Sequence, residues 1–305
     1  MPLHPHAAAF IDQWNATGTK AHDLTPQQIR ERRISELLPG ESVYRVENRK
    51  IDGPAGEVPV RLYWPSDQRQ LPILLWFHGG GWVLGDLNGA DGLCRALANR
   101  VGAIVISVDY RMAPDFKFPS AVEDGYAAIL WAAGNAAQIK GDRQRLAVGG
   151  SSAGGNLAAA LSLMVRDRKG PLLCHQLLVY PVIDHQFERE SYLSNAKGYC
   201  LTRQAMIWYW DQYVPDPTQR DHPYVSPLKA ENLTQLPSAH VVTAEFDPLR
   251  DEGEAYANAL TQVGIKVTCT RFNGQIHGFF SCLESNDDAM VAVEEASGRL
   301  KEDLA

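Results

Sequence analysis

Short apolar runs alternate with amphipathic stretches along most of the chain from residue 71 onward. Six of these runs have the length and β-rich composition of strands, at 71–77, 104–108, 146–149, 177–180, 240–244 and 266–271. Several are apolar at every position, as expected of strands buried on both faces of a sheet. The amphipathic stretches predict helices at 91–100, 121–133, 153–168, 251–263 and 287–300. This alternation predicts an α/β fold with a mostly parallel central sheet flanked by helices. Upstream, the runs 43–46 and 58–64 predict an antiparallel pair of strands.

Two stretches interrupt the alternation. Residues 1 to about 40 contain two helical patterns, the second opened by a capping signal at Thr25 and Pro26. Residues 184–235 lie between two predicted strands and are far longer than an ordinary connection. Inserts of this length are usually lids or binding elements. We therefore expect the two stretches to pack together as a helical cap. This divides the chain into cap residues 1–40 and 184–235 and catalytic-core residues 41–183 and 236–305.

The composition is that of a globular protein with a large core. Of the 305 residues, 45% are hydrophobic and 21% are charged, and the formal net charge is −7. This balance favours binding neither to nucleic acid nor to an anionic membrane. No apolar run is long enough to span a bilayer, and the first residues lack the basic start and apolar core of a signal peptide.

The cysteines and histidines predict neither disulfides nor a metal site. The five cysteines are scattered and form no C-x-x-C, which fits reduced thiols in a cytoplasmic protein. The nine histidines show no H-E-x-x-H or comparable ligand spacing. We expect no metal, no other cofactor and a cytoplasmic location.

Residues 150–154 read Gly-Ser-Ser-Ala-Gly, the G-x-S-x-G pattern of a nucleophile elbow. The pentapeptide follows a predicted strand and precedes a predicted helix, so Ser152 lies at a strand-to-helix turn. That is the setting in which a serine hydroxyl can act as a nucleophile. The N-terminus of the following helix offers backbone N–H groups, including that of Ala153, to a developing negative charge.

A second glycine-rich signal comes directly after the predicted strand at 71–77. It reads His78-Gly79-Gly80-Gly81, and glycines let the backbone turn its N–H groups toward a bound oxygen. Loops of this type supply oxyanion donors in lipases and esterases. The competing interpretation, a phosphate cradle, lacks a following Gly-Lys-Ser or Gly-Lys-Thr. We expect Gly79, Gly80 or Gly81 to donate together with Ala153, and His78 to support the loop by hydrogen bonds.

A nucleophilic serine needs a base and an acid that orients the base. His277 follows the last predicted strand and is the expected base, whereas His185 and His222 fall in the predicted cap and His240 opens a strand.

Asp247 follows the strand at 240–244 and is the expected acid. Its rivals are Asp251, which reads as a first-turn helix residue, and Asp184, which comes too early. The order serine, acid, histidine is that of the α/β-hydrolase fold.

With these motifs in place, the chain resembles the bacterial hormone-sensitive-lipase-like esterases over essentially its whole length. The resemblance rests on HGGGW at 78–82, DYRMAP at 109–114, the elbow with Gly155 and Asn156 after it, and DPLRDEG at 247–253 with HGF at 277–279. It implies carboxylester hydrolysis by Ser152, His277 and Asp247 under a helical cap, with a small ester as substrate. Dimers are common among similar proteins, which leaves a homodimer open.

Two positions depart from the usual pattern of that family. Ser151 stands where many members carry aspartate, and Asp115 stands where glutamate is usual after Ala-Pro. Neither is the expected nucleophile, base or acid, so they bear on the subgroup and not on the chemistry.

Two other functions use the same sequence features. An amidase or formamidase would use the same triad, and a non-catalytic ligand receptor would normally lack the histidine found here at 277.

The predicted cap is rich in aromatic residues, namely Phe10, Trp14, Trp208, Tyr209, Trp210 and Tyr213. One interpretation is that they only pack the cap onto the core. The other is that some of them line an acyl pocket suited to short or medium chains.

Overall fold

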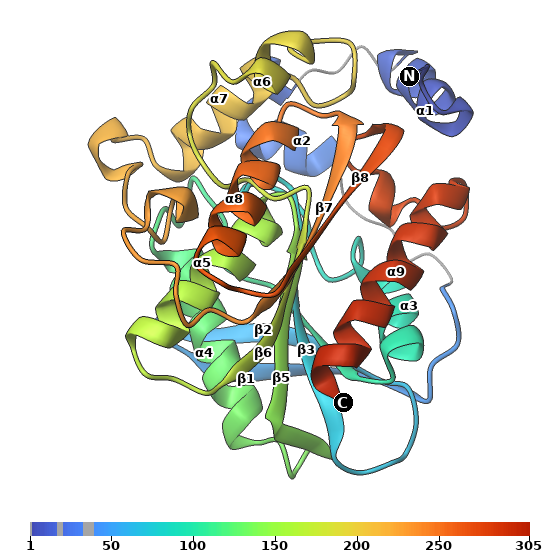
Figure 1. Ribbon diagram of the computed structural model, residues 1–305, viewed down its shortest axis with the longest axis vertical. Helices are drawn as coiled ribbons and strands as arrows, with labels where there is room; N and C mark the ends of the chain where they lie inside the picture. Colours follow the sequence, from blue (N-terminus) through green and yellow to red (C-terminus); the bar gives the residue numbers. More distant parts are fainter. Residues whose placement is uncertain (1, 17–20, 33–39) are drawn as a thin grey trace.

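The computed structural model describes residues 2–16, 21–32 and 40–305. Its centre is one eight-stranded sheet in the order β1-β2-β4-β3-β5-β6-β7-β8 (Figure 1). The strands are β1 (Arg45–Gly53), β2 (Gly56–Trp64), β3 (Leu71–Phe77), β4 (Ile104–Val108), β5 (Gly141–Ser151), β6 (Leu173–Val179), β7 (Ser238–Phe246) and β8 (Val267–Ile276). β2 pairs antiparallel with β1 and with β4, and all pairs from β4 to β8 are parallel. The predicted α/β-hydrolase sheet is confirmed.

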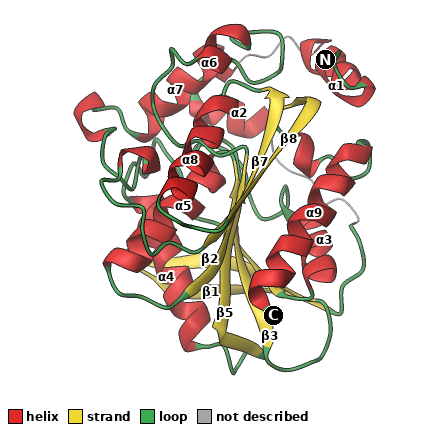
Figure 2. Cartoon of the chain, in the orientation of Figure 1, coloured by secondary structure: helices red, strands yellow, loops and turns green. Residues whose placement is uncertain are grey.

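Helices cover both faces of this sheet (Figure 2). One layer packs α3 (Asp91–Val101) against α9 (Asp287–Leu304). The other layer holds α4 (Ser120–Gly134), α5 (Ala153–Asp167) and α8 (Arg250–Gln262). The inner strands are apolar on both sides because each face is buried under helices; β4 has no exposed residue.

The two stretches that interrupt the alternation form short helices near the carboxyl ends of the strands (Figure 1). The N-terminal stretch holds α1 (Pro5–Ala16), η1 (Ala21–Asp23) and α2 (Pro26–Arg32). The insert after β6 holds α6 (Glu190–Ser194), α7 (Arg203–Tyr213), η2 (Pro217–Gln219) and η3 (Pro227–Lys229), and η4 (Phe279–Ser281) follows β8. η1 contacts α7, so the two stretches touch. Residues 17–20 and 33–39, which belong to the predicted N-terminal part of the cap, lie outside the described residues.

The helices of residues 2–16, 21–32 and 40–305 include none with the length and apolar character needed to cross a bilayer. In the same ranges, no three or more His, Cys, Asp and Glu side chains are grouped as metal ligands.

Candidate active site

Ser152 occupies the sharp turn between β5 and α5. Its φ is 57° and its ψ is −119°, a conformation that L-residues rarely adopt and that persists only where the surroundings hold it. The flanking glycines make the turn fit. A Cβ on Gly154 would lie 1.9 Å from the carbonyl oxygen of Phe77, and one on Gly150 would lie 2.3 Å from that of Gly154. Any larger residue at these two positions would displace the elbow from the end of β3.

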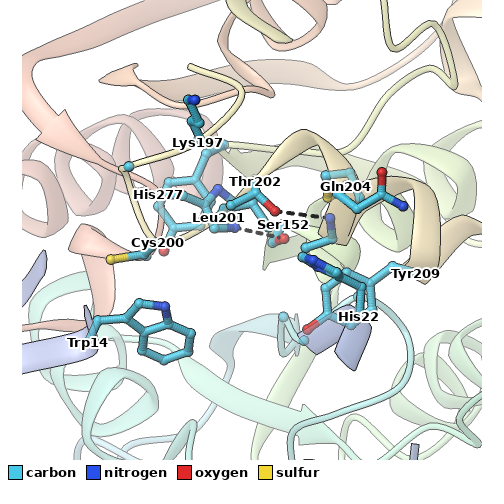
Figure 3. Close-up of a pocket in the computed structure, with 18 of the residues that line it drawn as sticks. Trp14, His22, Ser152, Lys197, Cys200, Leu201, Thr202, Gln204, Tyr209 and His277 are labelled. Carbon is cyan, nitrogen blue, oxygen red and sulfur yellow. Dashed lines mark hydrogen bonds between the residues drawn. The ribbon is translucent and has the colours of Figure 1, made fainter. Parts of the chain in front are cut away.

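A chain of hydrogen bonds links Ser152, His277 and Asp247. His277 follows β8 and Asp247 follows β7, and these neighbouring parallel strands bring both loops to the carboxyl edge of the sheet. His277 Nδ1 lies 2.7 Å from Asp247 Oδ2, and His277 Nε2 lies 3.0 Å from Ser152 Oγ. Since a carboxylate only accepts, Nδ1 donates to Asp247. In the neutral imidazole, Nε2 is then the acceptor for the serine hydroxyl, as Figure 3 shows by the dashed line between them.

Asp247 is held on both sides and is fully buried. Its Oδ1 accepts the backbone N–H of Leu249 at 2.9 Å, which leaves Oδ2 for His277. Its own carbonyl oxygen accepts Asn195 Nδ2, from the insert, at 3.3 Å. The carboxylate therefore faces the imidazole in a fixed orientation.

The rival acids have other partners. Asp251 accepts the backbone N–H of Ser191 at 2.8 Å and pairs with Arg250 at 2.9 Å. Asp184 pairs with Arg189 at 2.7 Å. Both carboxylates therefore serve to hold the insert and its neighbouring helix.

The rival histidines are likewise placed elsewhere. His185 lies 3.3 Å from the Ser226 hydroxyl, and the His222 ring packs against Phe118 at 5.2 Å between centroids. His240 is buried within β7, where Nε2 lies 3.3 Å from the Thr270 hydroxyl. Burial lowers the pKa of His240 to about 3, so this ring is neutral.

The three predicted loop glycines line the same cavity as Ser152 and His277. Gly80 and Gly81 have φ values of 115° and 62°, which only glycine adopts without strain. The carbonyl of Gly80 accepts the N–H groups of Val83 and Leu84 at 3.1 and 2.9 Å, so the loop is a tight turn. Ala153 is buried and opens α5 beside Ser152, where its N–H has no intrahelical acceptor.

His78 lies beneath this loop and not in the cavity of Ser152. Its Nδ1 donates to the carbonyl of Gly79 at 2.8 Å, and its ring stacks on Tyr110 at 4.5 Å between centroids. The Tyr110 hydroxyl in turn donates to the carbonyl of His78 at 2.8 Å. Burial lowers the pKa of His78, so the ring is neutral and acts through these contacts.

The cavity above Ser152 has a volume of about 650 Å³. Trp14 from α1 and Tyr209 from α7 form part of its wall (Figure 3). Phe10 from α1 and Met206 from α7 also line it. The polar part of the wall includes the side chains of Asn15, His22, Lys197, Thr202 and Gln204. A cavity of this size, with a mostly apolar wall and polar groups beside the serine, is typical of a small-molecule site.

The aromatic residues of the two stretches divide into two groups. Phe10, Trp14 and Tyr209 line the cavity. Trp210 and Tyr213 are fully buried, and Tyr213 stacks on Trp82 at 4.4 Å. Trp208 packs against the core, half-buried. One group therefore faces the cavity, and the other packs in the interior of the protein.

Sequence reasoning missed Tyr180, which contacts His277. Tyr180 follows β6, has a φ of 33°, and its ring centroid lies 4.5 Å from that of His277. Burial raises the pKa of its hydroxyl, so Tyr180 stays protonated and acts as a wall for the imidazole. Its place at the carboxyl end of a predicted strand was the available signal. Asn195, inside the long insert, carried none.

The sheet topology, with a serine at a strand-to-helix elbow and an acid and a histidine after later strands, defines the class of α/β hydrolases. Residues 74–281 match the family described as alpha/beta hydrolase fold. The chain therefore belongs to the α/β-hydrolase family, and the predicted resemblance to its hormone-sensitive-lipase-like esterases is confirmed.

Three relatives show how far the similarity extends. The chain is 39% identical over 290 residues to the carboxylic ester hydrolase LipN of Mycobacterium tuberculosis, covering 93% of this chain and 77% of that protein. It is 38% identical over 300 residues to an arylesterase of Saccharolobus solfataricus, covering 96% and 97%. The solved structure of a hyperthermophilic esterase from the archaeon Pyrobaculum calidifontis superposes with a TM-score of 0.94 at 38% identity, over 100% of both chains.

Proposed function

We propose that this protein is a carboxylic ester hydrolase in which Ser152, His277 and Asp247 form a catalytic triad. The observation that carries the proposal is the hydrogen-bond chain from Ser152 Oγ through His277 to Asp247, at 3.0 and 2.7 Å. Relatives named as ester hydrolases, similar over nearly the whole chain, support the same reaction.

Acylation begins when Ser152 attacks the ester carbonyl. His277 Nε2 accepts the serine proton, and Asp247 stabilises the resulting imidazolium and keeps Nδ1 oriented. The carbonyl oxygen becomes an oxyanion that receives hydrogen bonds from N–H groups of Gly79, Gly80 or Gly81 and of Ala153. Each such donor contributes about a hundredfold or more in rate. His277 then gives its proton to the leaving alcohol, and the acyl group stays on Ser152.

Deacylation repeats these steps with water as the nucleophile. Water adds to the acyl carbon while His277 accepts its proton, and the same donors hold the oxyanion. Collapse of the tetrahedral species releases the carboxylic acid and returns the proton to Ser152.

The cap and the acyl pocket form part of the same proposal. Residues 1–40 and 184–235 act as a helical cap over the core formed by 41–183 and 236–305. The contact between η1 and α7, and the cavity wall that α1 and α7 share, support this division. The aromatic walls favour short to medium acyl chains, because Phe10 and Trp14 bound the space above Ser152.

Initial rates on a ladder of p-nitrophenyl esters from acetate to palmitate test the proposal. We expect a maximum at short or medium acyl length and a loss of several orders of magnitude in Ser152→Ala. Full activity of Ser152→Ala would overturn the triad. An amide panel run beside the ladder tests the amidase alternative, and hydrolysis of neither substrate class would favour the ligand receptor.

Two expectations from the sequence stay predictions. One is a homodimer, which size-exclusion chromatography with light scattering would test. The other is the cytoplasmic location, which rests on the five scattered cysteines and their lack of a C-x-x-C pattern.

A further inference from the structure

A second cavity, of about 240 Å³, adjoins the substrate cavity at the glycine loop. Four residues line both cavities, namely Gly79, Gly80, Ser151 and Ser281. The rest of its wall comes from Trp76 and His78 at the end of β3, from the loop after Trp82 and from the start of α3, the last two including Asp86, Ala90 and Leu93. None of the latter lines the substrate cavity, so the second cavity approaches the elbow from another direction.

This second cavity is open to solvent and partly polar. Gly89 and Ser281 at its wall are exposed. Its polar groups include the Asp86 carboxylate and the hydroxyls of Ser151 and Ser281. His78 also lines it, and among the described residues its buried Nε2 has no hydrogen-bond partner. A partly polar cavity of this size has room for ordered water, and His78 Nε2 is available to bind it.

The proposed reaction requires a water molecule beside His277 once the alcohol has left. After acylation the acyl group occupies the substrate cavity, where Phe10 and Trp14 bound the space above the serine. Water must nevertheless reach the acyl carbon beside His277. The second cavity offers a path that the acyl group does not fill, along the hydroxyls of Ser151 and Ser281.

We propose that the second cavity is the route by which water reaches the acyl-enzyme, with Ser151 and Ser281 positioning water where the two cavities meet. The inference rests on the proposed ester hydrolysis. In the step it serves, the water oxygen forms a bond to the acyl carbon and its proton passes to His277 Nε2. The bond to Ser152 Oγ then breaks, the proton returns to that oxygen, and the carboxylic acid leaves. At position 151, where many related esterases carry aspartate, serine keeps this junction small and uncharged.

Ala90→Leu tests the route from outside the catalytic machinery. Ala90 lines the second cavity alone and sits at the start of α3, so leucine adds bulk to that wall without touching the substrate cavity. The matched control is Ala90→Ser, which keeps the space open and suits the N-cap position. With p-nitrophenyl butyrate, acid quench and intact-protein mass spectrometry measure the steady-state ratio of acylated to free enzyme.

In Ala90→Leu we expect this ratio to rise about tenfold while kcat/KM stays unchanged, because only the step after acylation slows. Ala90→Ser should match the wild type. An unchanged ratio in a folded Ala90→Leu enzyme would overturn the route. So would a fall in kcat/KM, which would mean that the leucine disturbs acylation instead.

Leu93→Phe, in the first turn of α3, fills the second cavity in the same way should Ala90→Leu not fold, and the same two outcomes apply to it. A failure of the proposed ester hydrolysis would give a different result from a failure of the water route. If the wild type releases no p-nitrophenol and forms no acyl-enzyme on Ser152, the ester reaction itself is wrong. If the wild type turns over normally and neither variant changes the ratio of acylated to free enzyme, only the water route is wrong.

Discussion

The ring of Tyr209 lies against Gly81 so closely that a Cβ at position 81 would be 2.2 Å from it. Tyr209 comes from α7 in the insert after β6, whereas Gly81 belongs to the loop after β3. The φ of Gly81, 62°, is also one that favours glycine. The insert therefore packs on the loop that is proposed to hold the oxyanion, and the shape of one depends on the other.

Gly81→Ala should lower kcat/KM for esters by about a hundredfold, since the added methyl group must displace either the loop donors or Tyr209. Adding Tyr209→Ala to Gly81→Ala should restore part of this loss, because the clash is relieved. Kinetics on p-nitrophenyl butyrate measure both effects. Gly92→Ala is the control, since nothing lies within 4 Å of a Cβ there. Wild-type kinetics in Gly81→Ala would contradict the prediction.

Asp247→Asn should reduce kcat by about 10³- to 10⁴-fold, because an amide cannot stabilise the imidazolium and favours the wrong tautomer of His277. Asp251→Asn is the matched comparison. Its carboxylate holds Ser191 and Arg250, so its loss should lower thermal stability and change kcat less than tenfold. Steady-state kinetics and thermal melting on both variants check this. Equal losses of kcat would show that Asp247 has no special role.

The strands that the sequence predicts best are the fully buried ones. The runs 71–77 and 104–108 coincide with β3 and β4, because strands covered on both faces are apolar throughout. β5 is longer than the predicted run at 146–149, since it begins at Gly141 with a polar, partly exposed segment. Outside the core, the apolar pattern no longer marks where a strand begins, and backbone pairing with neighbouring strands decides it.

The candidate active site could likewise be predicted from the sequence only in part. The sequence could indicate that Ser152, Asp247 and His277 lie at one edge, because loops after parallel strands gather there. It could not indicate that Tyr209 packs on Gly81 or that Tyr180 contacts His277. These pairs join segments far apart in the chain, and an aromatic residue in a helix or after a strand has the same pattern whether it fills the core or faces a cavity.

Arg30→Ala should destabilise the protein by about 2 kcal/mol. Arg30, in α2, donates to the carbonyls of Val83 and Ala113 at 2.8 and 2.5 Å and pairs with Asp115 at 2.6 Å. It thereby ties the N-terminal stretch to two core loops. Asp115→Asn should cost at most about 1 kcal/mol, since that pair is partly exposed.

Urea unfolding of both variants, with the exposed Arg299→Ala as control, tests whether Arg30→Ala lowers the free energy of unfolding more than Asp115→Asn does. A loss in Asp115→Asn as large as in Arg30→Ala would mean that the ion pair, and not the two carbonyls, holds α2. At position 115, where the sequence departs from the usual glutamate, the shorter aspartate side chain is the one that meets Arg30.

Glu252→Gln should make the protein more stable than the wild type at neutral and alkaline pH and equally stable near pH 4. Burial raises the pKa of Glu252 well above its ordinary value. Oε1 accepts the N–H of Ile183 at 2.8 Å, and among the described residues Oε2 has no hydrogen-bond partner to offset the loss of water around a charge.

The direction of this pH dependence follows from proton binding by Glu252 in the folded and unfolded states. The folded state holds the Glu252 proton to higher pH than the unfolded chain does, so the stability it contributes is present at low pH. That contribution is lost as pH rises from the ordinary carboxyl range through the raised pKa. Glutamine keeps the oxygen that accepts from Ile183 and cannot ionise. Urea unfolding of Glu252→Gln and wild type across this pH range should therefore give a difference that grows with pH, whereas the exposed Glu302→Gln should show no such growth. A difference independent of pH would mean that Glu252 ionises as readily inside the protein as in water.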